Sequence, residues 1–181
     1  SNHARSPQRV NAGAWGTGPL LQPVVEVSAG GYHTCAIQAD STLWCWGKHY
    51  FGQLGIGSSG NNHYSPVRVN PAIWGTGHAH TAVVAVSAAR RHHTCALLED
   101  GTLWCWGKGL HGRLGTGSEA DQVSPVQIMP HGDSDTDTMV VGLCAGLYHS
   151  CAILAGGTLQ CWGRNQSGQL GTAPTPQQQQ L

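Results

Sequence analysis

The sequence predicts an all-β protein built from three copies of one four-stranded unit. Three observations support this prediction: an internal repeat, apolar residues that alternate with a period of two, and many turn-forming residues. The chain has 26 Gly and 9 Pro among its 181 residues, enough to join many short strands. The most similar segments are HTCAIQADSTLWCWG at 33–47, HTCALLEDGTLWCWG at 93–107 and HSCAILAGGTLQCWG at 149–163.

Each unit contains four strand-like runs. The unit opens with SPQRV (6–10), SPVRV (65–69) or SPVQI (124–128). It continues through VVEVSAG (24–30), VVAVSAA (83–89) or VVGLCAG (140–146), and the hairpin quoted above supplies the last two strands. After the hairpin come GQLGIG, GRLGTG or GQLGTA. We assign residues 1–172 to three repeats, at about 6–64, 65–123 and 124–172, and residues 173–181 to a low-complexity tail.

The hairpin of each unit places two cysteines opposite each other. Directly opposed residues on antiparallel strands lie about 4.5–5.5 Å apart, a separation that a disulfide can bridge. Buried reduced cysteines remain an alternative, whereas zinc is disfavoured because nine residues separate each pair. Disulfides would place the chain outside the cell, in a secretory lumen or in a periplasm. The expected pairs are Cys35 with Cys45, Cys95 with Cys105, and Cys151 with Cys161.

Cys144 is left without a partner by this pairing. It stands where the other two repeats have Ser28 and Ser87. Two interpretations remain: a buried replacement of serine by cysteine within a strand, or a cysteine that forms an intermolecular bridge.

Both faces of the hairpin are apolar. In the first repeat His33, Cys35 and Leu43 share one face, and Trp44 and Trp46 lie on the other. Each small sheet must therefore be covered on both sides, as it is in a β-propeller. Histidine recurs at positions 33, 93 and 149, about 60 residues apart, so we expect structural histidines bonded to backbone rather than a metal site.

The motifs G-x-x-H-[ST]-C-A-[IL], L-x-C-W-G, G-[QR]-L-G and S-P-V resemble the regulator of chromosome condensation repeat, in the cysteine-paired form of extracytoplasmic proteins. The resemblance covers residues 6–171. It implies four-stranded blades of a propeller that usually has seven. The family includes a nuclear exchange factor for a small GTPase and a secreted inhibitor of β-lactamases, but no functional residue carries over to this chain.

Three units are too few to close a propeller, which typically needs four to eight blades. The predicted object is therefore an open arc with two uncovered apolar faces and free strand edges. Either further blades of a longer chain cover these faces, or copies of the chain associate. The run at 6–10 is available to complete a blade.

Composition disfavours several classes of function. The nine Lys and Arg balance nine Asp and Glu, and they are scattered apart from Arg90-Arg91, which we interpret as a solvated turn. Without a visible basic face we expect no nucleic-acid partner, and without a long apolar run no membrane span. Asp133, Asp135 and Asp137 resemble a calcium loop but lack its Gly and distal Glu, so we predict no metal and no cofactor. No catalytic constellation is visible, and we predict that the chain is not an enzyme.

The loop tips between W-G-[KR] and G-[QR]-L-G differ among the repeats, which suits a binding surface, with ordinary loop drift as the alternative interpretation. Candidate contact residues are His49, Tyr50, Phe51, Leu110 and His111. Asn165 begins an N-x-S sequon and is a possible glycosylation site. The leading hypothesis is a non-catalytic extracytoplasmic module that binds a protein partner. The alternatives are a structural subunit of an extracellular filament or coat, assembled through open blade edges, and a GTPase exchange factor.

Overall fold

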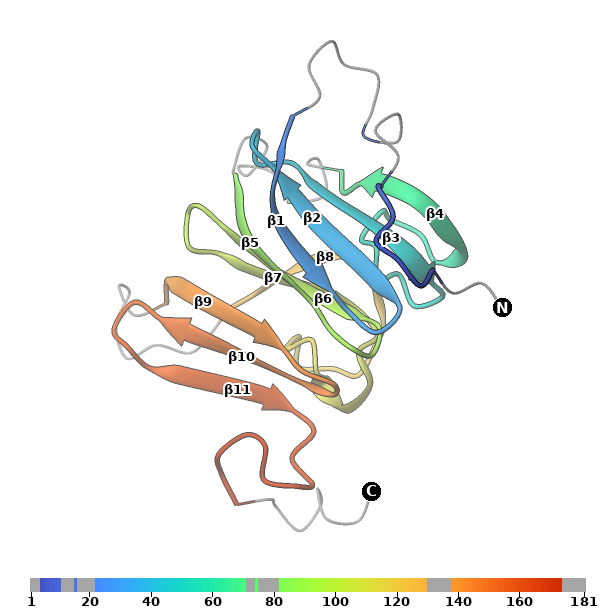
Figure 1. Cartoon of the computed structure of the whole chain (residues 1–181). Helices are drawn as coiled ribbons and strands as arrows, with labels where there is room; N and C mark the ends of the chain where they lie inside the picture. The colour runs from blue at the N-terminus through green and yellow to red at the C-terminus, as the bar shows by residue number, and fades with distance from the viewer. Residues whose placement is uncertain are drawn as a thin grey trace.

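A computed structural model of the chain describes residues 4–10, 15, 22–70, 74, 82–129 and 138–173. These residues form three antiparallel β-sheets that follow one another along the chain and lie side by side like the blades of a fan (Figure 1). The all-β fold class predicted from the repeat is confirmed. The described residues contain no helix long and apolar enough to cross a bilayer.

The first two blades have four strands each, and the third has three strands among the described residues. The first blade contains β1 (Val24–Ala29), β2 (His33–Gln38), β3 (Leu43–His49) and β4 (Gly60–Arg68). The second contains β5 (Val83–Ala88), β6 (His93–Leu98), β7 (Leu103–Gly107) and β8 (Gln122–Ile128), with the short 3-10 helix η3 (Leu110–Gly112) before β8. The third contains β9 (Val140–Ala145), β10 (His149–Leu154) and β11 (Leu159–Gly163).

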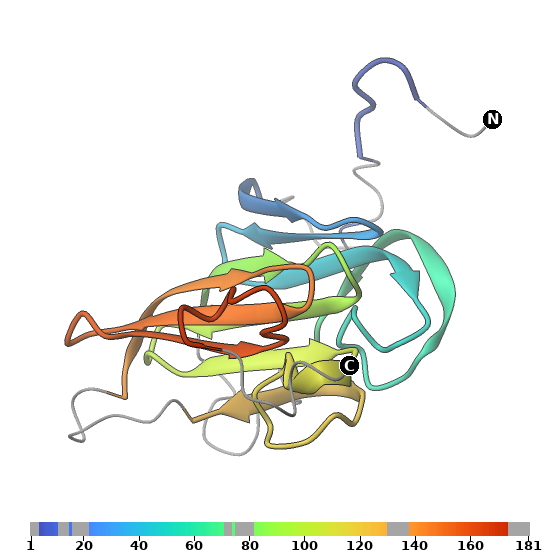
Figure 2. The same cartoon turned by 90° about the horizontal axis from the view of Figure 1, so that it is seen from below.

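The S-P-V runs complete the blade that precedes them in the chain. In β4, Val67 lies opposite Cys45, and in β8, Val126 lies opposite Cys105. The corresponding run at 6–10 is exposed and belongs to no strand. Figure 2 shows residues 4–10 apart from the three sheets. The outer edge of β11 therefore has no strand partner among the described residues.

The predicted hairpin register is confirmed in all three blades. The two cysteines of each pair lie directly opposite each other, with Cα atoms 4.1 Å apart, slightly closer than expected, and each pair forms a disulfide.

The same register requires the glycine of each L-x-C-W-G strand. Gly47 has a φ of +108°, and a Cβ there would lie 2.6 Å from the carbonyl oxygen of Tyr32 and 2.8 Å from Cα of His33. A larger residue at this position would push β2 and β3 apart.

Each blade buries its hairpin face against the first strand of the next blade. Ile37 and Leu43 of the first blade belong to the same core as Val83 and Val86 of β5. Leu97 and Leu103 of the second blade pack in the same way with Val140 and Leu154 of the third blade. The core of the molecule is therefore a set of contacts between blades.

The tryptophan of each W-G-T-G segment packs on the blade that follows the segment in the chain. Trp74 is buried and meets the rings of Trp104 and Trp106 edge-on, at 5.5 and 5.9 Å between centroids. Trp15 makes the same edge-on contacts with Trp44 and Trp46, at 5.9 and 5.7 Å. Edge-on contacts of this kind are favourable between aromatic rings, so they fix one residue of each connecting segment against a blade.

The recurring histidines link neighbouring blades. Thr94 donates its hydroxyl hydrogen to the carbonyl oxygen of Gln53 over 2.8 Å, so it accepts the hydrogen bond from Nε2 of His33, also 2.8 Å long. His93 pairs with Ser150 in the same way over 3.0 Å, because the Ser150 hydroxyl donates to the carbonyl of Arg113. The structural role is as expected, but the partner is a hydroxyl of the next blade and not backbone.

Candidate functional site at the loop end

One end of the three blades carries the loops that differ among the repeats. We call it the loop end. It consists of the turns before β2, β6 and β10 and the loops after β3, β7 and β11. Antiparallel pairing places these six segments together, because the end of each blade's first strand adjoins the beginning of its second and the end of its third (Figure 1). The opposite end, which we call the hairpin end, carries the β2–β3, β6–β7 and β10–β11 turns.

A cluster of aromatic and cationic side chains joins the first and second blades at the loop end. The rings of Tyr32 and His92 are stacked with centroids 5.0 Å apart, and Phe51 lies 5.0 Å from His92 on a tilted plane. Nζ of Lys48 lies 4.8 Å from the centre of the Tyr32 ring, and Nζ of Lys108 lies 4.2 Å from that of Phe51. At these distances the face of each ring attracts the cation above it.

The side chain of Gln53 makes hydrogen bonds to two members of this cluster. It is fully buried, and its amide nitrogen lies 3.2 Å from Nδ1 of His92. Its side-chain oxygen accepts a 3.0 Å hydrogen bond from the backbone N–H of Phe51. Burial, followed by the charges of Lys48 and Lys108, lowers the pKa of His92 to about 4, so this ring is neutral at neutral pH.

A second cluster joins the second and third blades around the ring of Tyr148. Guanidinium carbons of three arginines lie 4.9 to 5.5 Å from the centre of this ring, and one histidine ring meets it edge-on at 5.8 Å. Burial and the nearby Arg113 lower the pKa of the histidine. The four side chains are Arg91, Arg113, Arg164 and His111.

The predicted contact residues do not all reach the surface. Tyr50 and Leu110 are 58% and 39% exposed, and Phe51 and His111 are half-buried. His49, in contrast, is buried and meets the ring of His63 edge-on at 5.3 Å. The first tip position points inward, so His49 is not available to a partner, and the second and third positions form the surface.

Asn165 takes the same inward position in the third blade, which disfavours the possible glycosylation. Its amide nitrogen donates to the carbonyl oxygen of Thr172 over 3.1 Å, and its side-chain oxygen accepts the N–H of Leu170 over 3.1 Å. The residue is 1% exposed. A glycan on Nδ2 would break the bonds that close this loop.

Cys144 lies in β9 opposite Cys151, is the free cysteine of the described residues, and is exposed. The interpretation as a buried replacement of serine is therefore wrong. In the other blades Ser28 and Ser87 accept backbone N–H groups of Ala88 and Ala145, over 2.9 Å each, from the following blade. Cys144 is exposed because it occupies this position on the last described blade.

The grouping of cations at the loop end was not predicted from the sequence. Six of the nine Lys and Arg residues of the chain lie there, contrary to the prediction of a scattered distribution. The signal was present in the repeat, because Lys48, Lys108 and Arg164 all follow W-G. Arg90 and Arg91 lie exposed in the β5–β6 turn, as expected, but Arg91 also contacts the Tyr148 cluster.

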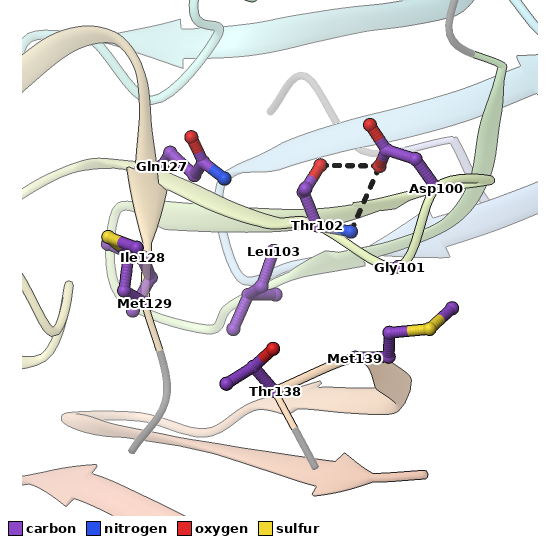
Figure 3. A pocket seen from close by; sticks show the side chains of 9 residues that line it. All are labelled: Asp100, Gly101, Thr102, Leu103, Gln127, Ile128, Met129, Thr138 and Met139. Carbon is purple, nitrogen blue, oxygen red and sulfur yellow. Dashed lines mark hydrogen bonds between the residues drawn. The ribbon is translucent and has the colours of Figure 1, made fainter. Parts of the chain in front are cut away.

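A pocket of about 280 Å³ lies at the hairpin end, beside the β6–β7 turn (Figure 3). Its lining includes one ionisable side chain, Asp100. Oδ1 of Asp100 accepts hydrogen bonds from the backbone N–H and hydroxyl of Thr102, over 3.0 and 2.7 Å, as the dashed lines in Figure 3 show. This carboxylate holds its turn, and the pocket is a weaker candidate site than the loop end.

The aspartates that resemble a calcium loop, Asp133, Asp135 and Asp137, lie outside the described residues, as do residues 174–181 of the expected tail. Within the described ranges, no three His, Cys, Asp or Glu side chains come together as a metal site would require.

Two family models of the Regulator of chromosome condensation (RCC1) repeat match the chain. One matches residues 40–97 and 100–153, and the other matches residues 24–53, 83–113 and 140–169. Among curated proteins, the chain is 31% identical to the human E3 ubiquitin-protein ligase HERC2 over 148 residues, and 32% identical to the Ultraviolet-B receptor UVR8 of Arabidopsis thaliana over 145 residues. These alignments cover 82% and 80% of the chain but 3% and 30% of the relatives.

Solved structures show the same fold. The structure of Prp20p from Saccharomyces cerevisiae, described with its binding to Gsp1p and histones, matches with a TM-score of 0.70 at 24% identity. That match covers 85% of the chain and 35% of Prp20p. Human WBSCR16 matches with a TM-score of 0.59 at 22% identity, over 71% of the chain and 30% of that protein. The chain therefore spans about a third of these structures or less.

Proposed function

Because the chain belongs to the regulator of chromosome condensation repeat family, we propose that it is a non-catalytic module that binds another protein through its loop end. Repeats of this family generally act as interaction or exchange-factor modules. The observation that carries the proposal is the loop end itself. A recurring framework of W-G-[KR] and G-[QR]-L-G residues holds side chains that differ from blade to blade, and Tyr50 among them is exposed.

We also propose that the chain works in an oxidising compartment. Three disulfides in three equivalent positions support this placement, because cytosolic reductants would keep such cysteines reduced. Finding the six paired cysteines as thiols in protein isolated under alkylating conditions would contradict it.

Replacing the first loop tip with the third tests the proposed interface. The double variant Tyr50→Gln, Phe51→Ser gives the first loop the residues Gln166 and Ser167 that the repeat already tolerates. We expect a photo-crosslinker placed at Leu110 to form a protein adduct in the native medium, and the double variant to reduce its yield about tenfold, because aromatic anchors dominate binding energy.

The matched control is Tyr64→Ser, which removes an aromatic side chain that is 92% exposed on β4. This variant should leave the adduct unchanged. Equal loss in the control and the loop variant, or no adduct at all in the wild type, would contradict a binding role for the loop end.

A second candidate function is head-to-tail assembly into a filament or coat, and the two end faces of the fan favour it. On the last blade Ile153 and Leu159 are 46% and 65% exposed, whereas the equivalent Leu97 and Leu103 are buried by the third blade. On the first blade Val27 is 64% exposed, whereas its equivalent Val86 is buried. The two faces match as neighbouring blades do, so one copy can cover the next in an open-ended series.

Head-to-tail assembly predicts that the sedimentation coefficient rises with protein concentration. Val27→Lys should abolish this rise, because it places a charge in the new interface without touching an existing one. Val84→Lys, which adds the same charge on the middle blade where Val84 is 45% exposed, is the control. A chain that remains monomeric at every concentration would overturn this second candidate and leave the first untouched.

A further inference from the structure

The loop end is strongly basic although the chain is neutral. Six cations and two carboxylates, Glu119 and Asp121, lie there, which gives a formal charge of +4 (six minus two), whereas the whole chain has a formal net charge of zero. Both carboxylates bind backbone: Glu119 accepts the N–H of His111 over 3.0 Å, and Asp121 accepts that of Gly109 over 2.9 Å. The six cations are Lys48, Arg90, Arg91, Lys108, Arg113 and Arg164.

Arg113 is the unusual member of this group. It stands in G-[QR]-L-G where the other repeats have Gln53 and Gln169, and it is 1% exposed. Nε donates to the carbonyl oxygen of Leu110 over 2.7 Å, and Nη1 donates to that of Arg91 over 3.1 Å. Nη2 is buried and has no hydrogen-bond partner. A buried guanidinium with a free donor is costly, and a carboxylate is the group that fits its planar fork.

The backbone carbonyl of Arg113 makes the two hydrogen bonds that recur at this position of the repeat. Its carbonyl oxygen accepts hydrogen bonds from the Ser150 hydroxyl and from Nε1 of Trp162, over 2.9 and 3.0 Å. The carbonyl of Gln53 does the same for Thr94 and Trp106, over 2.8 and 3.0 Å. Gln suffices for these two hydrogen bonds, so they do not require the positive charge of Arg113.

We infer that the loop end binds an acidic segment of a partner protein, whose carboxylates enter between the guanidinium groups around Tyr148. This inference rests on the proposed function and names the chemistry of its partner. Arg113 supplies the buried charge, and Arg91 and Arg164 supply donors nearer the surface. Leu110 and Leu147, each 39% exposed, offer apolar contact beside the cations.

Nucleic acid fits this surface less well. Base stacking needs open ring faces, but cations and His92 already pack on Tyr32 and Phe51, and three guanidinium groups pack around Tyr148. The sequence pI of about 7.1 is also well below that of typical nucleic-acid-binding domains.

The test measures binding of the whole chain to a fluorescent peptide of alternating glutamate and leucine by anisotropy. The same peptide with glutamine in place of glutamate controls for apolar attraction, and duplex DNA is the third probe. We expect the glutamate peptide to bind most tightly, with an affinity that falls as salt increases. Arg113→Gln should weaken it about tenfold, as expected when a buried positive charge next to the bound carboxylates is lost.

Arg113→Gln introduces the residue of the other repeats, so it should fold, and unchanged tryptophan fluorescence would check this. Arg68→Gln removes an equal charge at the hairpin end and should not change peptide affinity. Equal binding of the glutamine peptide, tighter binding of DNA, or no effect of Arg113→Gln would overturn the inference.

Selection from an unbiased displayed peptide library separates this inference from the proposed function. Enriched peptides rich in Asp and Glu, lost with Arg113→Gln, support both. Enriched neutral or basic peptides that protect the loop end overturn the acidic partner but leave the interaction module. A failure to enrich any peptide at the loop end counts against both.

Discussion

Lowering the pH from about 7 to about 5 is expected to reduce the free energy of unfolding by about 4 kcal/mol, close to 2 kcal/mol for each of two buried histidines. Burial, followed by the nearby His92, lowers the pKa of His33 to about 4. Burial, followed by the charge of Arg113, lowers that of His93 to about 3. Both rings link blades in their neutral form.

The sign follows from proton uptake. In the unfolded chain these histidines have the ordinary pKa of about 6.5, so below that pH the unfolded state binds protons that the folded state does not. Stability is therefore complete above about pH 6.5, declines as the pH falls, and levels off once the pH is below the folded pKa values of about 4 and 3.

Urea denaturation across this pH range measures the effect. His93→Gln keeps an N–H donor for Ser150 without a titrating ring and should remove about half of the pH dependence. The double variant with His33→Gln should remove most of it. If the double variant keeps the slope of the wild type, the histidines are not the cause.

Trp106→Ala should destabilise the chain by about 4 kcal/mol at neutral pH, near the upper end of the range for large core side chains. The ring is 0% exposed, packs edge-on against Trp74, and donates from Nε1 to the carbonyl oxygen of Gln53. A Cβ on Gly55 would lie 2.6 Å from that nitrogen, so neighbouring backbone packs closely against the indole. We expect this backbone not to move into the cavity that the alanine variant leaves.

Trp162→Ala is the matched control for this variant. Trp162 makes the same hydrogen bond in the third blade, to the carbonyl oxygen of Arg113 over 3.0 Å, but it is half-buried. It should cost about half as much, because less apolar surface leaves water when it packs. Equal costs would show that the hydrogen bond, and not burial, sets the contribution of both rings.

The fold could be predicted largely from the repeat. Three sequences that differ in their turn residues agree on one register, and the structure pairs Cys35 with Cys45 and His33 with Gly47 as that register requires. Period-two alternation carries this information because a slip of one residue would reverse both faces of a hairpin. The lack of a strand partner for β11 among the described residues was not predicted, because each S-P-V run was assigned to the unit that it opens and not to the blade that precedes it.

The candidate site could be predicted only incompletely. Lys48 and Arg91 are far apart in sequence, and their common location depends on blade packing, which spacing does not report. Burial of single tip residues was equally hidden. His49 and Asn165 are polar, yet both point inward. Asn165 does so because its side chain closes the loop by hydrogen bonds, whereas His49 packs edge-on against the ring of His63.

The three disulfides have a mechanical consequence. Each joins residues 10 apart within one hairpin, so a pulling force on the chain cannot straighten the segment between them. The disulfide of each blade therefore prevents roughly 30 Å of chain from extending under force, at about 3.3–3.6 Å per residue. Tension can pull neighbouring blades away from each other while each hairpin stays intact, which makes the array a row of separable, individually locked units.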